Sequence, residues 1–308
     1  MYLVVEALIP TFFLVGLGLY IRRSGFVPQD QWEGLESLSY WLFFPALIFN
    51  VLINANLKNV PLGGMTATLA LTVIAAAVLL LALAPVFKNT LRIDGSSYTS
   101  IYQGVLRWNG FIALSVVQKL YGADAMALVA IAMAAMIPLI NVIVVGILAI
   151  FASSSKPSLG SVLINIFKNP LIWASILGLL VNMAEISLWD PLKTTIEVTA
   201  RAGLATGLLI VGAGLRLRDT FPPNKDIWIG TSLRLLGMPM IAIGFGLFFG
   251  LSGEVLEVAV ICTAVPTAMS GYVLAKKMGG NAPLLAAIVT MQTFLSAATI
   301  PLLLAFVK

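Results

Sequence analysis

The chain has 308 residues, of which 60% are hydrophobic and only 10% are charged, and its mean hydropathy is +1.02. Soluble domains carry about 25% charged residues, so this composition excludes a water-soluble fold and is typical of a membrane protein. Histidine is absent and Cys262 is the single cysteine, which rules out an intrachain disulfide and argues against metal sites and histidine-based enzymes. The formal charge of +5 comes from scattered basic residues, which do not form a nucleic-acid interface.

Ten apolar segments in chain order are long enough to be membrane spans. A spanning helix needs about 20 apolar residues, because unpaired backbone polar groups cannot face lipid. The first segment lacks a basic leader and a small-residue cleavage site, so we expect it to be retained. The connections are too short for another domain. The predicted spans are residues 3–22, 36–54, 64–87, 97–120, 124–151, 163–184, 193–215, 227–251, 254–275 and 282–307.

The basic residues predict the orientation of these spans. Most of the 18 Lys and Arg residues fall in loops that follow odd-numbered spans, as Arg22, Lys88, Arg216 and Lys276 illustrate. Short cytoplasmic loops carry the excess of positive residues in membrane proteins. We therefore expect a multi-pass protein with both termini outside the cytoplasm.

Two halves of five spans each would enter the membrane in opposite senses, as in transporters built from inverted repeats. We expect the first five-helix repeat at residues 1–151 and the second, inverted one at residues 163–308. Matching residues recur at nearly the same offset, about half the chain: Pro10 and Gly18 with Pro170 and Gly178, and Lys119 and Gly122 with Lys277 and Gly280.

Two of the predicted spans are interrupted at corresponding places. The fourth contains polar and flexible residues from Gln103 to Gly110, and the ninth contains Pro266, which lacks an amide hydrogen and breaks or kinks a helix. At the repeat offset, Asn109 corresponds to Thr267. We predict that helices 4 and 9 are broken and cross at mid-depth; in the alternative, Pro266 only kinks its helix and Gly110 only permits close packing.

A crossing of broken helices favours an anion, because the N-terminal ends of the second halves carry partial positive charge. Arg107 lies near the middle of its span and could attract a carboxylate, although a structural arginine is an equal alternative. Arg234 lies nearer the start of its span, and we expect it to snorkel to the interface. The candidate substrate-binding residues are Asn109, Gly110, Arg107, Pro266, Thr267 and Ser270.

Other polar residues inside the spans are candidates for lining an ion site or a pathway, with interhelical hydrogen bonding as the alternative. No Asp or Glu lies at a predicted midplane, which disfavours a cation antiporter based on paired carboxylates. We expect no cofactor and no metal, apart from a coupling H⁺ or Na⁺. The candidate lining residues are Asn50, Gln103, Asn141, Thr263 and Gln292.

Four motifs resemble those of the auxin efflux carrier family, including its bacterial malonate-type transporters: residues 43–49 (FFPALIF), 108–111 (WNGF), 168–170 (KNP) and 266–268 (PTA). The resemblance covers the whole chain. It implies ten helices in two inverted repeats, with substrate bound where broken helices 4 and 9 cross and with Asn109 and Pro266 at the crossing positions.

The resemblance also implies transport of a small organic anion, for example a dicarboxylate, across a bacterial-type inner membrane. Plant members carry a long loop between the halves, whereas the connection from Ala152 to Ser161 is short, so neither auxin nor plant-like regulation is carried over. The alternatives are a sodium-coupled organic anion symporter of the bile-acid-carrier type and a ligand sensor or channel without transport. An intramembrane enzyme would need a nucleophile and base that the sequence lacks. The expected partners are the organic anion and the bilayer; the oligomeric state stays open, with a homodimer among the alternatives.

Overall fold

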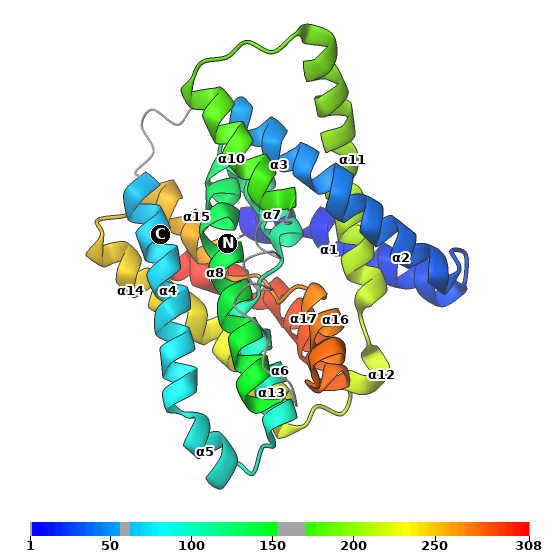
Figure 1. Ribbon diagram of the computed structural model, residues 1–308, viewed down its shortest axis with the longest axis vertical. Helices are drawn as coiled ribbons and strands as arrows, with labels where there is room; N and C mark the ends of the chain where they lie inside the picture. Colours follow the sequence, from blue (N-terminus) through cyan, green and yellow to red (C-terminus); the bar gives the residue numbers. More distant parts are fainter. Residues whose placement is uncertain (1, 56–61, 153–169, 308) are drawn as a thin grey trace.

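The computed structural model describes residues 2–55, 62–152 and 170–307, and its regular structure over these ranges is entirely helical (Figure 1). Helices occupy all ten predicted segments. The structure does not describe residues 163–169, which include two residues of the 168–170 motif, or the connection from residue 153 to 161. In chain order the elements are α1 (Tyr2–Ser24), α2 (Gln29–Leu38), η1 (Ser39–Phe43), α3 (Phe44–Ile53), α4 (Leu62–Ala82), α5 (Ala84–Asn89), α6 (Gly95–Leu106), α7 (Gly110–Tyr121), α8 (Met126–Phe151), α10 (Pro170–Met183), α11 (Asp190–Gly214), α12 (Leu217–Thr220), α13 (Lys225–Ser232), η2 (Leu233–Gly237), α14 (Met238–Phe248), α15 (Gly253–Ala264), α16 (Ser270–Met278) and α17 (Ala282–Val307).

Six continuous helical stretches among the described residues are long and apolar enough to cross a membrane by themselves. The helix α10 is apolar but shorter. The helices α6, α7 and α15 have 12 residues each, about 18 Å at 1.5 Å per residue, so none of them alone spans a hydrocarbon core of about 30 Å. The six stretches are Asp30–Ile53, Gly63–Ala82, Met126–Phe151, Asp190–Gly214, Lys225–Phe248 and Ala282–Val307.

Glycines allow α1 and α11 to pack backbone against backbone. A Cβ added to Gly18 would lie 2.1 Å from the carbonyl oxygen of Leu209, and one added to Gly212 would lie 1.8 Å from that of Val15. Neither position can accept a side chain, so the two helices approach as small-residue interfaces in membranes do. The helix α11 also contacts α3, which contacts α10, so these four helices form one group.

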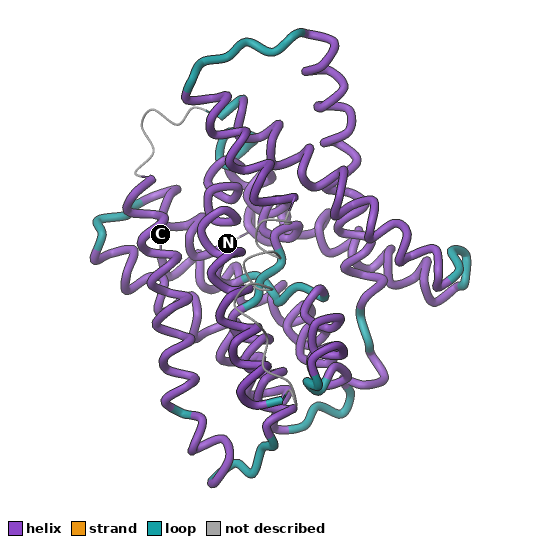
Figure 2. The backbone as a smooth tube through the Cα atoms, in the orientation of Figure 1, coloured by secondary structure: helices purple, strands orange, loops and turns teal. Residues whose placement is uncertain are grey.

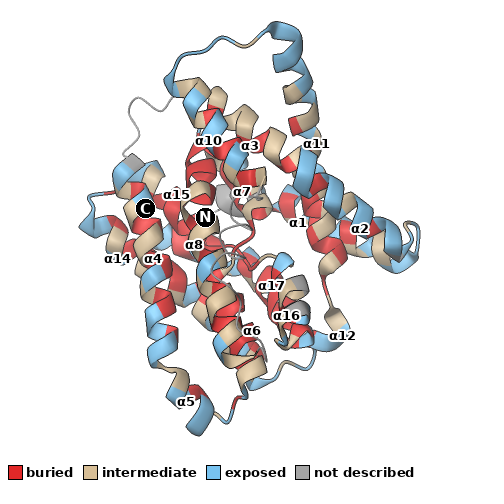
Figure 3. Cartoon of the chain, in the orientation of Figure 1, coloured by how far each residue is buried: buried red, intermediate tan, exposed pale blue. Residues whose placement is uncertain are grey.

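The second group consists of α4, α6, α8, α13, α14, α15 and α17, which contact one another and hold the most buried residues (Figure 3). In α6 every residue from Ser97 to Leu106 is buried, and in α15 every residue from Leu256 to Ala264. Burial on all sides is expected of helices at the centre of a membrane bundle. The helices α7 and α8 also contact members of the first group.

Two π-helical turns interrupt the regular helices, and each is followed within two residues by a proline. The turn η1 precedes Pro45 and η2 precedes Pro239. Proline lacks an amide hydrogen, so the helical ladder cannot continue unchanged through it. Single π-helical turns re-aim side chains and are frequent at functional sites. In this chain η1 brings Ser39 and Tyr40 to the cavity described below, and η2 carries Arg234 into the core.

Candidate functional site at a helix crossing

The structure has an interruption at each of the two predicted places. The chain is extended at residues 107–109 between α6 and α7, and non-helical at residues 265–269 between α15 and α16. The first residue of each break has nearly the same conformation: φ −68° and ψ 153° at Arg107, φ −65° and ψ 151° at Val265. The amide of Asn109 donates to the carbonyl oxygen of Pro266 at 2.8 Å, so the two breaks touch inside the molecule (Figure 2).

The carbonyl groups freed at the end of α6 are taken up by neighbouring side chains. Breaking a helix leaves carbonyl oxygens without partners, and a buried oxygen of this kind is costly. The carbonyl oxygen of Gly104 accepts from Thr267 Oγ1 at 2.5 Å and from Gln292 Nε2 at 2.9 Å. Gln292 Oε1 in turn accepts from the amide of Thr267 at 2.9 Å. Thr267 and Gln292 therefore hold the two breaks together.

Arg234 joins the C-terminal ends of both broken helices. Its guanidinium donates to Val265 O at 2.8 Å (Nε), Val105 O at 3.0 Å (Nη1) and Cys262 O at 3.2 Å (Nη2). The side chain is 0% exposed, so the expectation that Arg234 snorkels to the interface is wrong. The negative ends of α6 and α15 attract the cation, and three hydrogen bonds offset its desolvation.

The N-terminal ends of the second halves face the other way. Asn109 Oδ1 caps α7 by accepting from the amides of Phe111 at 3.1 Å and Ile112 at 3.2 Å. No hydrogen bond found among the described residues uses Asn109 Nδ2, which stays available as a donor. The helix α16 has no side-chain cap at its first turn, where Ser270 is exposed.

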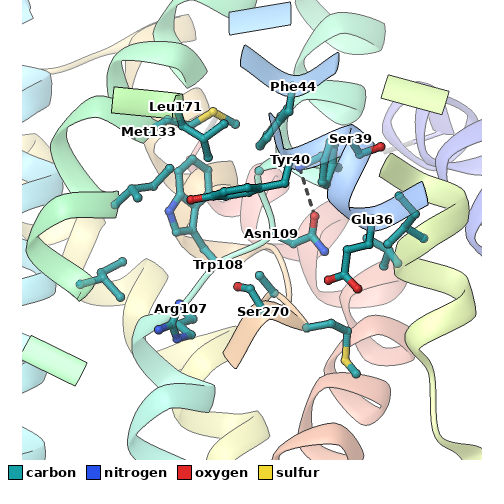
Figure 4. A pocket seen from close by; sticks show the side chains of 18 of the residues that line it. Glu36, Ser39, Tyr40, Phe44, Arg107, Trp108, Asn109, Met133, Leu171 and Ser270 are labelled. Atoms are coloured by element: carbon teal, nitrogen blue, oxygen red, sulfur yellow. Dashed lines mark hydrogen bonds between the residues drawn. The ribbon is translucent and has the colours of Figure 1, made fainter. Parts of the chain in front are cut away.

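A cavity of about 480 Å³ lies at this crossing, within the usual range of small-molecule sites. Figure 4 shows Arg107 and Ser270 on one side of Asn109, and Phe44, Met133 and Leu171 on the other. The crossing contributes Arg107, Trp108, Asn109, Gly110, Phe111, Ala268, Met269 and Ser270; α2, η1 and α3 contribute Glu33, Glu36, Ser37, Ser39, Tyr40 and Phe44; α8, α10 and α11 contribute Met133, Ile137, Ile140, Asn141, Leu171, Ile210 and Val211.

Four of the six candidate binding residues line the cavity: Arg107, Asn109, Gly110 and Ser270. Pro266 and Thr267 lie directly behind them and do not line it. Pro266 supplies the carbonyl that binds Asn109, while Thr267 is fully buried and engaged through both its amide and its hydroxyl.

The candidate lining residues are more scattered. Asn141 lines the cavity, and Gln103 Oε1 accepts from Arg107 Nε at 3.2 Å just beneath it. The other three lie outside the lining. Asn50 contacts Asn54 on its own helix, Thr263 donates to Ala259 O at 3.1 Å within α15, and Gln292 serves the crossing itself.

The wall formed by α2 and η1 was not predicted from the sequence. The predicted second span starts at residue 36, whereas the helix begins at Gln29 and brings Glu33 and Glu36 to the cavity. The spacing Glu33, Glu36, Tyr40 places three polar side chains on one helix face, and this periodicity was available as a signal. Acidic groups therefore do line the candidate site.

The chain matches the membrane transport protein family over residues 3–304. It is 24% identical to the transporter YfdV of Escherichia coli (strain K12) over 278 residues, 88% of this chain and 87% of YfdV. A transporter of Methanothermobacter thermautotrophicus is 24% identical over 312 residues, 96% of each chain. Auxin efflux carrier component 5 of Arabidopsis thaliana is 31% identical over 123 residues, 36% of this chain and 33% of the plant protein.

The family match spans nearly the whole chain and confirms the resemblance at the level of the family. The narrower resemblance to malonate-type members stays a prediction, as do the direction of the termini and the repeat arrangement. The chain therefore belongs to the membrane transport protein family that includes the auxin efflux carriers, and it is a multi-pass membrane transporter, not an enzyme.

Proposed function

We propose that this protein is a secondary transporter of a small organic anion, a carboxylate, which binds at the crossing of predicted helices 4 and 9. The observation that carries the proposal is the cavity into which the starts of α7 and α16 open beside Arg107. Helix N-termini carry partial positive charge and free amides, and both favour an anionic group.

The charges of the crossing itself support this polarity, whereas the two acids of the lining come from α2. Arg234 occupies the negative C-terminal ends of α6 and α15 on the buried side, so the cavity is left with the positive ends of α7 and α16. Arg107 adds a full positive charge to the lining, and Gln103 orients it from below. Asn109 Nδ2 and the hydroxyl of Ser270 can donate to a carboxylate.

The apolar wall of the cavity favours an organic anion over an inorganic one. Phe44 and Phe111 stack with ring centroids 4.0 Å apart, and Trp108 and Met133 line the same space. A purely inorganic ion would leave this surface without contacts, whereas the carbon part of a carboxylate would cover it.

The position of the cavity between the two groups of helices supports alternating access as the mechanism. The group around α1, α3, α10 and α11 contributes Tyr40 and Phe44 through the second span, and the other group contributes the crossing. Ten spans in two inverted five-helix repeats, residues 1–151 and 163–308, would relate the two breaks, as their matching backbone angles suggest. Rocking of one group against the other would expose the anion to each side of a bacterial-type inner membrane, with both termini outside.

Glu33 and Glu36 favour a cation-coupled variant of this function. Their carboxylates line the cavity, where they could accept a proton or a sodium ion together with the anion. Comparing uptake with sodium and with choline, at several pH values, separates sodium coupling from proton coupling.

The test uses two substitutions at Asn109 in proteoliposomes, after a thermal-shift screen of small carboxylates has identified a ligand. Asn109→Asp keeps an oxygen that caps α7, so folding is preserved, but it replaces the donor amide by a negative charge and should abolish uptake. Asn109→Ser keeps an oxygen for the cap and a smaller hydrogen-bond donor, so it should retain part of the uptake. Uptake by the Asp variant at the wild-type rate would refute the site. Binding without flux, or large unitary currents, would identify a sensor or a channel instead.

A further inference from the structure

A second cavity, of about 600 Å³, lies where the end of α1 meets the junction of α11 and α12. Its lining includes four arginines, Arg22, Arg23, Arg216 and Arg218, and only one acid, Asp219. It shares no lining residue with the cavity at the crossing. The transport mechanism proposed above does not use this cavity.

The backbone fixes the arginines in this arrangement although they come from distant parts of the chain. Arg22 Nη1 donates to the carbonyl oxygen of Ala213 at the negative end of α11. The amide of Arg216 donates to Thr290 Oγ1 of α17 at 2.9 Å. The contact between Gly212 and α1 holds the two segments together, so the four arginines line one cavity because of the fold.

The lining holds four arginines against one carboxylate, Asp219, so the cavity keeps an excess of positive charge. Among the described residues, no carboxylate forms a salt bridge with any of the four arginines. The ion pair that this part of the chain does contain joins Arg201 to Glu197, outside the cavity. Arg22 and Arg216 carry like charges and line the same cavity. Four like charges beside a single acid form a site that an anion would stabilise.

We propose that this cavity binds the phosphate headgroup of an anionic membrane lipid. Guanidinium groups bind phosphate oxygens in pairs, and the planar fork of arginine matches the geometry of a phosphate group. The cavity lies in a loop region predicted to be cytoplasmic, where basic sites between transmembrane helices meet anionic lipids.

The surface of α1 favours a lipid over free phosphate. Ile9, Phe13, Leu17 and Tyr20 are exposed at 59, 69, 36 and 68% and recur at helical spacing along one face, which leads toward Arg23. This apolar stripe can carry acyl chains while the headgroup occupies the arginines. A soluble phosphate would use the arginines and leave the stripe unused.

The experiment measures lipid binding by the purified full chain in detergent, by thermal shift and by native mass spectrometry. Phosphatidylglycerol, phosphatidylcholine and inorganic phosphate are the three probes. We expect phosphatidylglycerol to bind and stabilise the protein and phosphatidylcholine to have little effect. Equal effects of the two lipids on the wild-type chain would overturn the proposal. Stabilisation by inorganic phosphate without phosphatidylglycerol would keep the phosphate chemistry but overturn the lipid assignment.

A matched pair of variants tests the location. Arg23→Gln with Arg218→Gln removes two exposed guanidinium groups and should weaken phosphatidylglycerol binding roughly 30-fold, because each basic residue at an anionic surface contributes about 1 kcal/mol and 1.4 kcal/mol is tenfold. Lys88→Gln with Lys276→Gln removes the same charge from exposed positions outside the cavity and should change binding less than threefold, roughly. Equal losses in the two double variants would show a general charge effect and refute the site.

Discussion

Replacing Arg234 by methionine should destabilise the protein through the crossing itself. Methionine has a similar length but no donor, so Val105 O, Cys262 O and Val265 O would lose the side-chain donor that now reaches them. Hydrogen bonds between transmembrane helices contribute about 0.6 kcal/mol on average and about 1.7 at most. Three of them give a loss of roughly 2–5 kcal/mol in the free energy of unfolding.

An opposing effect makes the result informative. Removing a buried cation also removes its desolvation cost, which can make the hydrophobic replacement of an entire buried ion pair neutral. Here the acceptors are backbone oxygens that stay in place, and an unsatisfied buried acceptor is costly. We therefore expect the loss of hydrogen bonds to exceed the gain in desolvation.

Thermal unfolding in detergent measures the effect. Arg234→Lys keeps the charge but cannot reach three separated oxygens with one ammonium group, so its midpoint should lie between those of the wild type and the methionine variant. Arg201→Met is the control, because its ion pair with Glu197 is exposed and should contribute about 0–1 kcal/mol. A methionine variant that unfolds at the wild-type temperature would refute the role assigned to Arg234.

Two further predictions concern helix packing and capping. Gly212→Val should separate α1 from α11 and lower the unfolding temperature by several degrees, since its Cβ would meet Val15 O, whereas Gly16→Ala should be neutral because a Cβ there has no neighbour within 4 Å. Asp94 caps α6, and a hydrogen bond from the amide of Ser97 lowers the pKa of its carboxyl. Because the pKa of Asp94 is lower in the folded than in the unfolded protein, the cap contributes fully above the unfolded pKa and loses its contribution as the pH falls through the folded pKa. Asp94→Ala should therefore cost about 1 kcal/mol at pH 7 and progressively less as the pH falls below the unfolded pKa. The unfolding temperatures of the wild type and of Asp94→Ala are measured from pH 7 down to acidic pH. A difference between the two proteins that does not change with pH would contradict the reasoning.

The features predictable from the sequence are those whose causes are local. Hydropathy located the helical segments because each span needs its own apolar run. The breaks at residues 107–109 and 265–269 were predictable because Pro266 cannot donate and Asn109 is a good N-cap, both properties of single residues. The second span was predicted to start at residue 36, whereas α2 begins at Gln29, because a hydropathy pattern does not show that polar residues such as Glu33 line a cavity.

The remaining features depend on partners far away in the chain. Gln292 and Gly104 are 188 positions apart, and Arg234 and Val105 are 129 apart, so no window of sequence contains either contact. Two arginines inside apolar helices look alike in sequence, yet Arg234 finds three helix-end carbonyls and Arg107 faces a cavity. The two arginines differ because each lies beside different backbone groups that the helix breaks leave without a partner in the helix. Carbonyl oxygens at the ends of α6 and α15 are taken up by Arg234, Thr267 and Gln292, while the first turn of α16 has no side-chain cap. An anion in the cavity would face the positive end of this uncapped helix, which is why we propose the substrate site there.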